Sequence, residues 1–197
     1  MKNSELISII IPCFNGGETL ARTLNSLINQ TWKQKEIILV NDGSEDKYTL
    51  EVINKFKKNF DIIVINQKNL GLPAARNKGA NASTGEYLYF IDSDDWIESE
   101  TLELMYKSIK ADKFSAFIFS DLIIEGKSQK IIRKDYNFFE QLFINQLPYS
   151  IFISKKTWKK YGGYDENMKL GYEDWELNIR LGSNNQFGKR LAIPLFH

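Results

Sequence analysis

The stretch Tyr87-Leu88-Tyr89-Phe90-Ile91-Asp92-Ser93-Asp94-Asp95-Trp96 joins an unbroken apolar run to three closely spaced carboxylates. An apolar run without polar alternation is typical of a strand that is buried on both faces, as in parallel sheets. Burial does not explain the acids that follow it, whereas ligands of open α/β sheets bind beyond the carboxyl ends of the strands. The stretch therefore predicts a buried strand that carries an acidic site to one edge of a sheet.

Three earlier segments have the same continuous apolar character, and they are rich in β-branched residues. They are residues 6–11, 37–40 and 62–65. Each segment has the length of a short strand, and each is followed by polar or turn-forming residues. Together with the strand over residues 87–91, they predict four central strands of a mainly parallel sheet, each buried on both faces.

Amphipathic stretches separate these strands, which is the alternation expected of βα units. Two of the predicted helices follow the turns Asn15-Gly16-Gly17 and Asp42-Gly43-Ser44. The third is expected to begin near Pro73, which suits a first helical turn, and to stop at Gly85. This half of the chain therefore predicts a mixed α/β fold.

The pattern changes after residue 96. Ser99 is expected to cap a helix, and the apolar run over residues 116–124 with a turn at Gly126-Lys127 predicts a pair of strands. A last helix is expected to begin near Glu173. We expect this half to form a smaller, mixed portion of the fold.

Composition narrows the class of protein. Lys and Arg number 26 and Asp and Glu 25, so a formal net charge of +1 gives no electrostatic reason to expect a nucleic-acid partner. One cysteine, Cys13, and one histidine, His197, exclude an internal disulfide and a Cys/His zinc cluster. We expect a cytoplasmic protein, because this cysteine usage fits a reducing compartment, and a soluble one, because no apolar run reaches the roughly 18 residues of a spanning helix. Composition leaves open a peripheral association with the inner face of a membrane.

Asp92, Asp94 and Asp95 are candidate ligands of a divalent cation. Hard cations such as Mg²⁺ and Mn²⁺ prefer carboxylate oxygen, and adjacent carboxylates repel one another unless a cation or a basic group neutralises them. The alternative is an ordinary acidic turn that caps the following helix. We favour a site for a metal and a diphosphate.

Two further segments place polar groups at the same predicted edge of the sheet. Asp42 follows the second strand, where its carboxylate can accept a hydrogen bond from the imide N–H of uracil; the alternative is a simple Asp-Gly turn. Arg76 lies in the segment Asn69–Gly79, and its planar donor fork suits a diphosphate or a base; the alternative is a helix residue that faces solvent.

The pair Glu173-Asp174 lies at the N-terminus of the last predicted helix. Acids are favoured there by the helix dipole, which is the structural interpretation. In the functional interpretation, one of the two is a general base that deprotonates an incoming hydroxyl.

These segments, in this order, resemble the inverting, nucleotide-sugar-dependent glycosyltransferases of family 2, which have the GT-A fold. The resemblance extends from residues 8–15 through 27–31 and 40–44 to the acidic cluster and the Glu173-Asp174 pair. It implies a Rossmann-like, mainly parallel central sheet flanked by helices, with a smaller mixed C-terminal portion.

The resemblance also implies a division of the chain. Residues 1–197 would form a single catalytic domain, with a nucleotide-binding half over 1–96 and an acceptor-facing half over 97–197. Many relatives continue beyond the corresponding point, so a truncated C-terminus, with the chain as the catalytic part of a longer enzyme, stays open.

Site residues follow from the same resemblance. Asp92 would approach the ribose or the donor sugar, and Asp94 would hold Mn²⁺ or Mg²⁺. Asp95 would orient the donor sugar or support the metal shell. Asp174 would be the catalytic base, and Asp42 would contact the uracil edge. The residues expected to line the nucleotide pocket are Pro12, Phe14, Asp42, Asn69 and Arg76.

The implied activity is a metal-dependent, hexosyltransferase-like reaction. A sugar would move from a nucleotide-sugar, with a UDP-sugar favoured, to a hydroxyl of a glycan or a lipid-linked acceptor. One alternative is a non-catalytic module that binds nucleotide-sugars. A nucleotidyltransferase is a weaker alternative, because the first strand is not followed by a glycine-rich basic loop. His197 has two interpretations, a ligand that completes a metal shell or an exposed terminal side chain.

Overall fold

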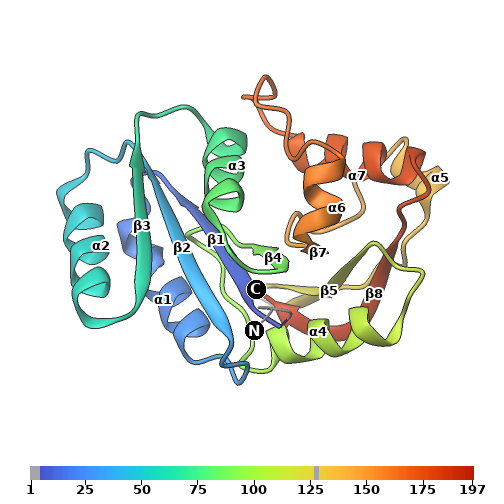
Figure 1. Cartoon of the computed structure of the whole chain (residues 1–197), viewed down its shortest axis with the longest axis horizontal. Coiled ribbons are helices and arrows are strands. Elements are labelled where there is room, and N and C mark those ends of the chain that lie inside the picture. Colours follow the sequence, from blue (N-terminus) through green and yellow to red (C-terminus); the bar gives the residue numbers. More distant parts are fainter. Residues whose placement is uncertain (1–4, 127–128) are drawn as a thin grey trace.

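A computed structural model describes residues 5–126 and 129–197 of the chain. Its strands form one sheet in the order β3-β2-β1-β4-β7-β5-β6, and β8 pairs with β5 (Figure 1). The strands are β1 (Ile7–Cys13), β2 (Lys35–Asp42), β3 (Ile62–Gln67), β4 (Tyr87–Phe90), β5 (Phe117–Ile124), β6 (Lys130–Ile132), β7 (Phe152–Ser154) and β8 (Gly188–Phe196). The helices are α1 (Gly17–Ile28), α2 (Lys47–Asn59), α3 (Leu72–Ala82), α4 (Thr101–Ala111), α5 (Phe138–Gln141), α6 (Lys155–Lys160) and α7 (Glu173–Ser183).

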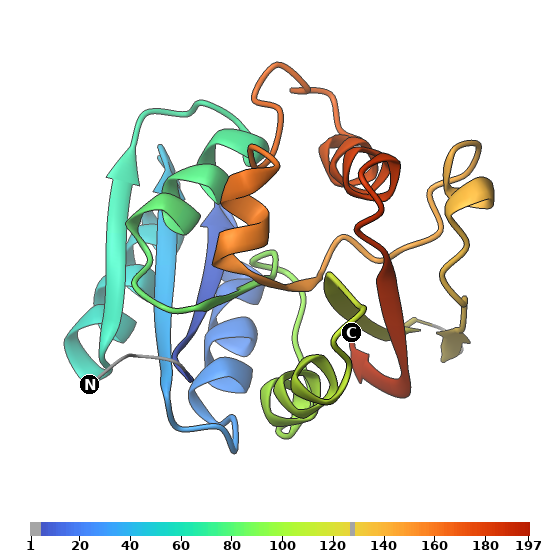
Figure 2. The same cartoon turned by 45° about the vertical axis from the view of Figure 1, so that its right-hand side comes forward.

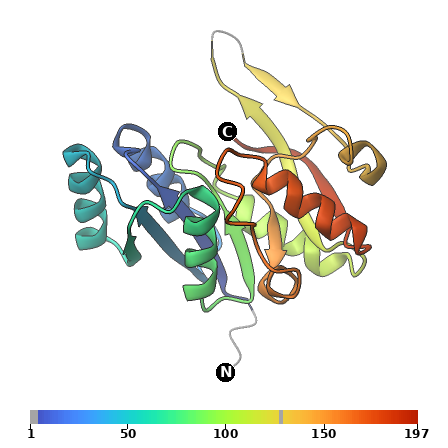
Figure 3. The same cartoon turned by 90° about the horizontal axis from the view of Figure 1, so that it is seen from above.

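Strands β1 to β4 form the parallel half of the sheet, as the sequence predicts. Strand β1 pairs in parallel with β2 and β4, and β2 pairs in parallel with β3. Ile9 packs in the core under α1, α2 and α4, whereas Ile10 packs on the opposite face with α3, α6 and α7. Figure 3 shows α1 and α2 on one side of these strands and α3 on the other. The burial of β1, β2 and β4 on both faces is confirmed.

The structure contradicts the prediction that β3 is buried on both faces. This strand lies at the edge of the sheet, and Ile63 is 43% exposed although Ile62 is buried. Helix α2 covers one face of β3, but α3 packs on β1 and β2. An apolar run of this length does not distinguish an edge strand from a central one, because local sequence does not reveal which helix covers its second face.

The second half of the sheet is mixed. Strand β7 lies antiparallel between β4 and β5, and the predicted strand pair is present as antiparallel β5 and β6. Lys127, which belongs to the predicted turn between β5 and β6, lies outside the described residues. Strand β8 returns parallel to β5 and brings His197 beside Trp96, where the two backbones exchange hydrogen bonds of 2.9 and 3.1 Å (Figure 2).

Two predicted helix ends differ from the structure. Helix α4 begins after Glu100 without a side-chain cap, and the Ser99 carbonyl instead accepts a hydrogen bond from the Thr31 N–H. Helix α3 ends at Ala82, so Gly85 is not its stop. Gly85 is required by packing, since a Cβ there would lie 2.6 Å from the Leu6 carbonyl oxygen. The helix starts predicted near Pro73 and Glu173 are confirmed.

Within residues 5–126 and 129–197, the helices are too short and too polar to cross a membrane.

The close approach at Gly85 gives a stability test. We expect Gly85→Ala to lower the free energy of unfolding by about 1–3 kcal/mol, because backbone atoms at Leu6 cannot move aside cheaply. Chemical denaturation measures the change. The matched control is Gly126→Ala, since a Cβ at Gly126 meets nothing within 4 Å. Equal stabilities of the two variants would contradict this account of Gly85.

Candidate active site

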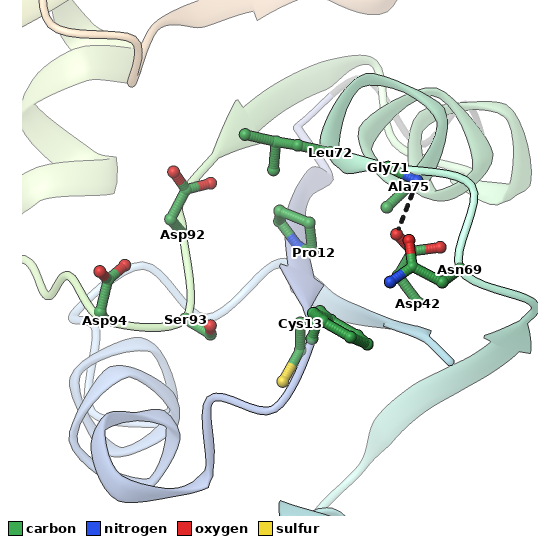
Figure 4. A pocket seen from close by; sticks show the side chains of 11 residues that line it. Pro12, Cys13, Asp42, Asn69, Gly71, Leu72, Ala75, Asp92, Ser93 and Asp94 are labelled. Atoms are coloured by element: carbon green, nitrogen blue, oxygen red, sulfur yellow. Dashed lines mark hydrogen bonds between the residues drawn. The ribbon is translucent and has the colours of Figure 1, made fainter. Parts of the chain in front are cut away.

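The carboxyl ends of β1, β2 and β4 meet at one edge of the sheet and line a cavity of about 300 Å³ (Figure 4). We name it the donor-side cavity, after the nucleotide that the sequence predicts at this edge of the sheet. A parallel sheet collects residues distant in sequence at such an edge, because all its strands end there. The lining residues are Pro12, Cys13, Phe14, Asp42, Asn69, Gly71, Leu72, Ala75, Asp92, Ser93 and Asp94. Four of the five residues expected in a nucleotide pocket therefore lie together, with Arg76 as the exception.

Asp42 organises the loop that leads into α3. Its Oδ1 accepts hydrogen bonds from Gln67 Nε2 at 2.7 Å and from the Leu70 N–H at 2.9 Å. Its Oδ2 accepts from the Gly71 N–H at 2.9 Å, the contact drawn in Figure 4. A carboxylate offers about four acceptor positions, so the protein leaves about one of them for a ligand. Gly71 has φ of 97°, a backbone conformation that favours glycine.

Arg76 lies behind the donor-side cavity. Its side chain is 1% exposed, and Nη2 donates to both oxygens of Asp92 at 2.7 and 2.9 Å. Nη1 donates to Glu173 Oε1 at 2.5 Å. The guanidinium also lies over the rings of Tyr149 and Tyr164, 4.8 and 5.3 Å from their centroids. The structure therefore places Arg76 as a bridge between the end of β4 and the start of α7.

The electrostatics of this bridge keep Arg76 charged. Burial alone would lower the pKa of Arg76, but the charge and hydrogen bonds of Asp92, together with Tyr164 and Tyr149, outweigh burial and raise this pKa. A buried guanidinium needs such partners, because an unpaired charge in the protein interior is strongly unfavourable.

The three aspartates after β4 lie close together, as the sequence suggests. Ligand oxygens of Asp92, Asp94 and Asp95 are all within 4.8 Å of one another. The Tyr149 hydroxyl donates to Asp95 Oδ2 and accepts from the Asp92 N–H at 2.8 Å, which holds two of them in place. Burial, with smaller contributions from the charges of Asp94 and Asp92, raises the pKa of Asp95 to about 6.

Asp94 differs from its two neighbours. Its side chain is exposed, and no group among the described residues donates a hydrogen bond to its carboxylate. A free carboxylate beside two that are held in place is a donor set that fits a hard divalent cation. Asp94 would be the principal ligand, with Asp92 or Asp95 beside it.

The surroundings of His197 agree with neither the metal-ligand nor the exposed-side-chain interpretation. Its side chain is 4% exposed and stacks on Trp96 at a centroid distance of 3.5 Å, so it is not an exposed terminal side chain. Nε2 lies 3.0 Å from Glu98 Oε1, and Nδ1 lies 3.6 Å from Glu125 Oε1. Among the described residues, the group able to hold a metal consists of the three aspartates without His197.

A second cavity, of about 570 Å³, lies on the other side of Asp94. We name it the acceptor-side cavity, because it contains Asp174, the base that the sequence analysis predicts. Asp174, in the first turn of α7, lines it, and its Oδ2 accepts a hydrogen bond from Asn145 Nδ2 at 3.0 Å. The lining residues are Arg22, Asp94, Asp95, Trp96, Leu122, Ile123, Ile124, Glu125, Leu147, Pro148, Tyr149, Asp174, Phe196 and His197. Asp94 lines both cavities, which therefore meet at this carboxylate.

Sequence reasoning missed Tyr149 as a site residue, and it considered Glu173 only as one of two candidate bases, not as the partner of Arg76. Tyr149 precedes β7, and nothing in the local pattern indicates that its hydroxyl reaches the aspartates 54 and 57 positions away. Glu173 carried a signal in its pairing with Asp174, but its partner Arg76 is 97 positions away. Such contacts depend on tertiary packing.

The combination of sheet and acidic edge defines a GT-A glycosyltransferase fold. The solved structure of S. aureus TarS residues 1–349 aligns with a TM-score of 0.77 and 22% identity, covering 96% of this chain and 59% of that one. The TarS complex with UDP-GlcNAc aligns with a TM-score of 0.78 and 21% identity, covering 96% and 57%.

Sequence comparison gives the family. The profile of Glycosyl transferase family 2 matches residues 8–168, and the chain belongs to this family. A cholesterol galactosyltransferase of Borreliella burgdorferi is 45% identical over 107 residues, 54% of this chain and 30% of that protein. The poly(ribitol-phosphate) beta-N-acetylglucosaminyltransferase TarP of Staphylococcus aureus is 38% identical over 130 residues, 64% of this chain and 39% of that protein. The matched regions span well under half of these curated relatives.

The Arg76 bridge gives a second stability test. We expect Arg76→Ala to lower the free energy of unfolding by about 3–5 kcal/mol, because it leaves Asp92 and Glu173 without their buried counter-ion. Denaturant titration measures the loss. The control is Arg22→Ala, which removes an exposed ion pair with Glu125 and should leave stability near that of the wild type. A loss of stability in Arg76→Ala as small as that of the control would contradict the role of the Arg76 ion pairs in stabilising the fold.

Proposed function

We propose that this chain is the catalytic domain of an inverting, metal-dependent glycosyltransferase. It moves a sugar from a UDP-sugar to a hydroxyl of a glycan or a lipid-linked acceptor. The observation that carries the proposal is the position of Asp94, which lines both the donor-side cavity and the cavity that contains Asp174. A sugar bound at this junction has its leaving group on one side and a base on the other.

The donor nucleotide occupies the donor-side cavity, lined by the first half of the chain. Asp42 has about one acceptor position free for the uracil imide, and Phe14, which is 50% exposed, offers a ring against the base. Pro12 and Asn69 complete the same wall. The solved TarS complexes with UDP and with UDP-GlcNAc support a uridine nucleotide. Residues 1–96 therefore bind the nucleotide, and residues 97–197 face the acceptor.

The diphosphate lies against the aspartates after β4. Asp94 would hold Mn²⁺ or Mg²⁺, whose positive charge would offset the charge of the departing diphosphate. Asp92 is fixed by Arg76, and Asp95 by Tyr149, so both carboxylates keep their positions beside the donor sugar. Arg76 acts here through Asp92, as a positioning residue.

Asp174 is the proposed general base. One of its oxygens accepts from Asn145 Nδ2, which orients the carboxylate within the acceptor-side cavity. It removes the proton of the acceptor hydroxyl as that oxygen forms a bond to the anomeric carbon. The bond from this carbon to the diphosphate oxygen breaks on the opposite face, and its electron pair leaves with UDP. A single displacement of this kind inverts the carbon and needs no nucleophilic side chain.

Two isosteric variants separate binding from chemistry. We expect Asp94→Asn to abolish the Mn²⁺-dependent part of UDP binding, because it removes the free carboxylate of the cluster. Asp174→Asn should bind UDP and Mn²⁺ like the wild type but lose at least about a hundredfold in transfer rate, as expected for loss of a general base. Calorimetric titration with UDP, with and without Mn²⁺, measures binding, and release of UDP from a UDP-sugar measures turnover.

The control is Asp61→Asn, an exposed acid outside both cavities that should change neither quantity. Titration with GDP and dTDP tests the nucleobase, and tighter binding of either would overturn uracil as the nucleobase that the donor-side cavity selects. Transfer by Asp174→Asn at the wild-type rate would remove Asp174 as the base. Failure of all three nucleotides to bind would contradict the proposed function.

A further inference from the structure

The acceptor-side cavity has one acidic part and one apolar part. Its acidic part is formed by Asp94, Asp95, Glu125 and Asp174. Its apolar part comes from three segments that are distant in sequence: the end of β5, residues 147–148 and the end of β8. The apolar side chains are Leu122, Ile123, Ile124, Leu147, Pro148 and Phe196.

The acidic part disfavours an anionic acceptor. Arg22 is the one arginine or lysine among the residues that line the cavity, and its guanidinium pairs with Glu125 at 2.7 Å and lies 4.5 Å from the centroid of the Trp96 ring. His197 lies between Glu98 and Glu125. A divalent cation at Asp94 would arrive with the negative diphosphate, so it would not make the cavity attractive to phosphate. An anionic acceptor in this cavity would lie close to these carboxylates, and like charges at short range repel one another.

The apolar part is open to a ligand. Leu147 and Phe196 are buried, but Ile124 is 47% exposed at the end of β5 and Leu122 is partly exposed beside it. Figure 3 shows β5 and β6 extending beyond the body of the molecule, which places this end of β5 away from the covering helices. An apolar surface that continues from a catalytic carboxylate fits a ligand with a hydroxyl at one end and apolar carbon behind it.

We infer that the acceptor is an uncharged amphipathic molecule. Its neutral, hydroxyl-bearing head lies beside Asp174, and its apolar body lies against Leu122 and Ile124. The inference rests on the proposed function, because it uses Asp174 as the base, and it narrows the acceptor to one chemical class. Anionic acceptors, including those built on phosphodiesters, are excluded by the acidic part of the cavity.

Affinity for short alkyl glucosides tests the apolar contact without knowledge of the natural acceptor. Hexyl β-glucoside and methyl β-glucoside have the same neutral head, and they differ by five methylenes. Each methylene that becomes buried strengthens binding roughly threefold, so burial of three of them gives about a thirtyfold lower Kd. Hexyl phosphate carries the same chain on an anionic head and should bind more weakly than hexyl β-glucoside. Calorimetry on the chain saturated with UDP and Mn²⁺ measures all three.

A matched pair of variants locates the contact. Ile124→Ser should remove most of the advantage of hexyl over methyl β-glucoside. Ile63→Ser replaces an isoleucine of similar exposure on the edge strand β3, far from the cavity lining, and should retain the advantage. Thermal unfolding of both variants shows whether either has lost its fold.

Three results would overturn the inference: equal affinity for the two glucosides, an advantage that survives Ile124→Ser, or tighter binding of hexyl phosphate. Failure of both glucosides to bind would also overturn it. Each of these outcomes is compatible with tight binding of UDP and Mn²⁺, which is the observation on which the proposed function depends. Loss of UDP binding itself would instead refute the proposed function.

Discussion

The buried ion pairs that Arg76 makes with Asp92 and Glu173 are the interaction on which the site depends. Asp92 begins the acidic segment after β4, and Glu173 begins α7, so one guanidinium connects the end of β4 with the start of α7. Asp94 and Asp174 each lie within two positions of these anchored acids. The positions of the proposed metal ligand and the proposed base are therefore set by a charge that lies outside the donor-side cavity.

This arrangement also explains why so many acids can lie close together. Carboxylates at a sheet edge repel one another, and burial raises the pKa of Asp95 to about 6. Arg76 neutralises part of that charge, and the Tyr149 hydroxyl satisfies Asp95 and the Asp92 N–H without adding charge. What is left for a cation is the exposed Asp94, between the two cavities.

Much of the fold could be predicted because its signals are local. The apolar runs of β1, β2 and β4, the turns before α1 and α2, and Pro73 in α3 all reflect short-range constraints. The edge position of β3, the insertion of β7 and the return of β8 depend on pairing between distant segments, which periodicity does not encode.

The candidate site likewise has residues that could be grouped from the sequence and contacts that depend on tertiary packing. Pro12, Phe14, Asp42 and Asn69 could be grouped from sequence because strand ends of a parallel sheet meet at one edge. Arg76 was expected in the cavity, yet its buried guanidinium pairs instead with Glu173 at the start of α7 and with Asp92 after β4. The apolar part of the acceptor-side cavity was also unpredictable, since β5, residues 147–148 and β8 meet only in the folded chain.

The most direct test of the central claim is a crystal structure of the chain with UDP and Mn²⁺, measured with anomalous diffraction at the manganese edge. The account predicts one manganese peak within bonding distance of an Asp94 carboxylate oxygen, with the diphosphate on the donor side and Asp174 on the other. A manganese peak away from Asp94, or UDP bound outside the cavity lined by Asp42 and Asp94, would contradict it.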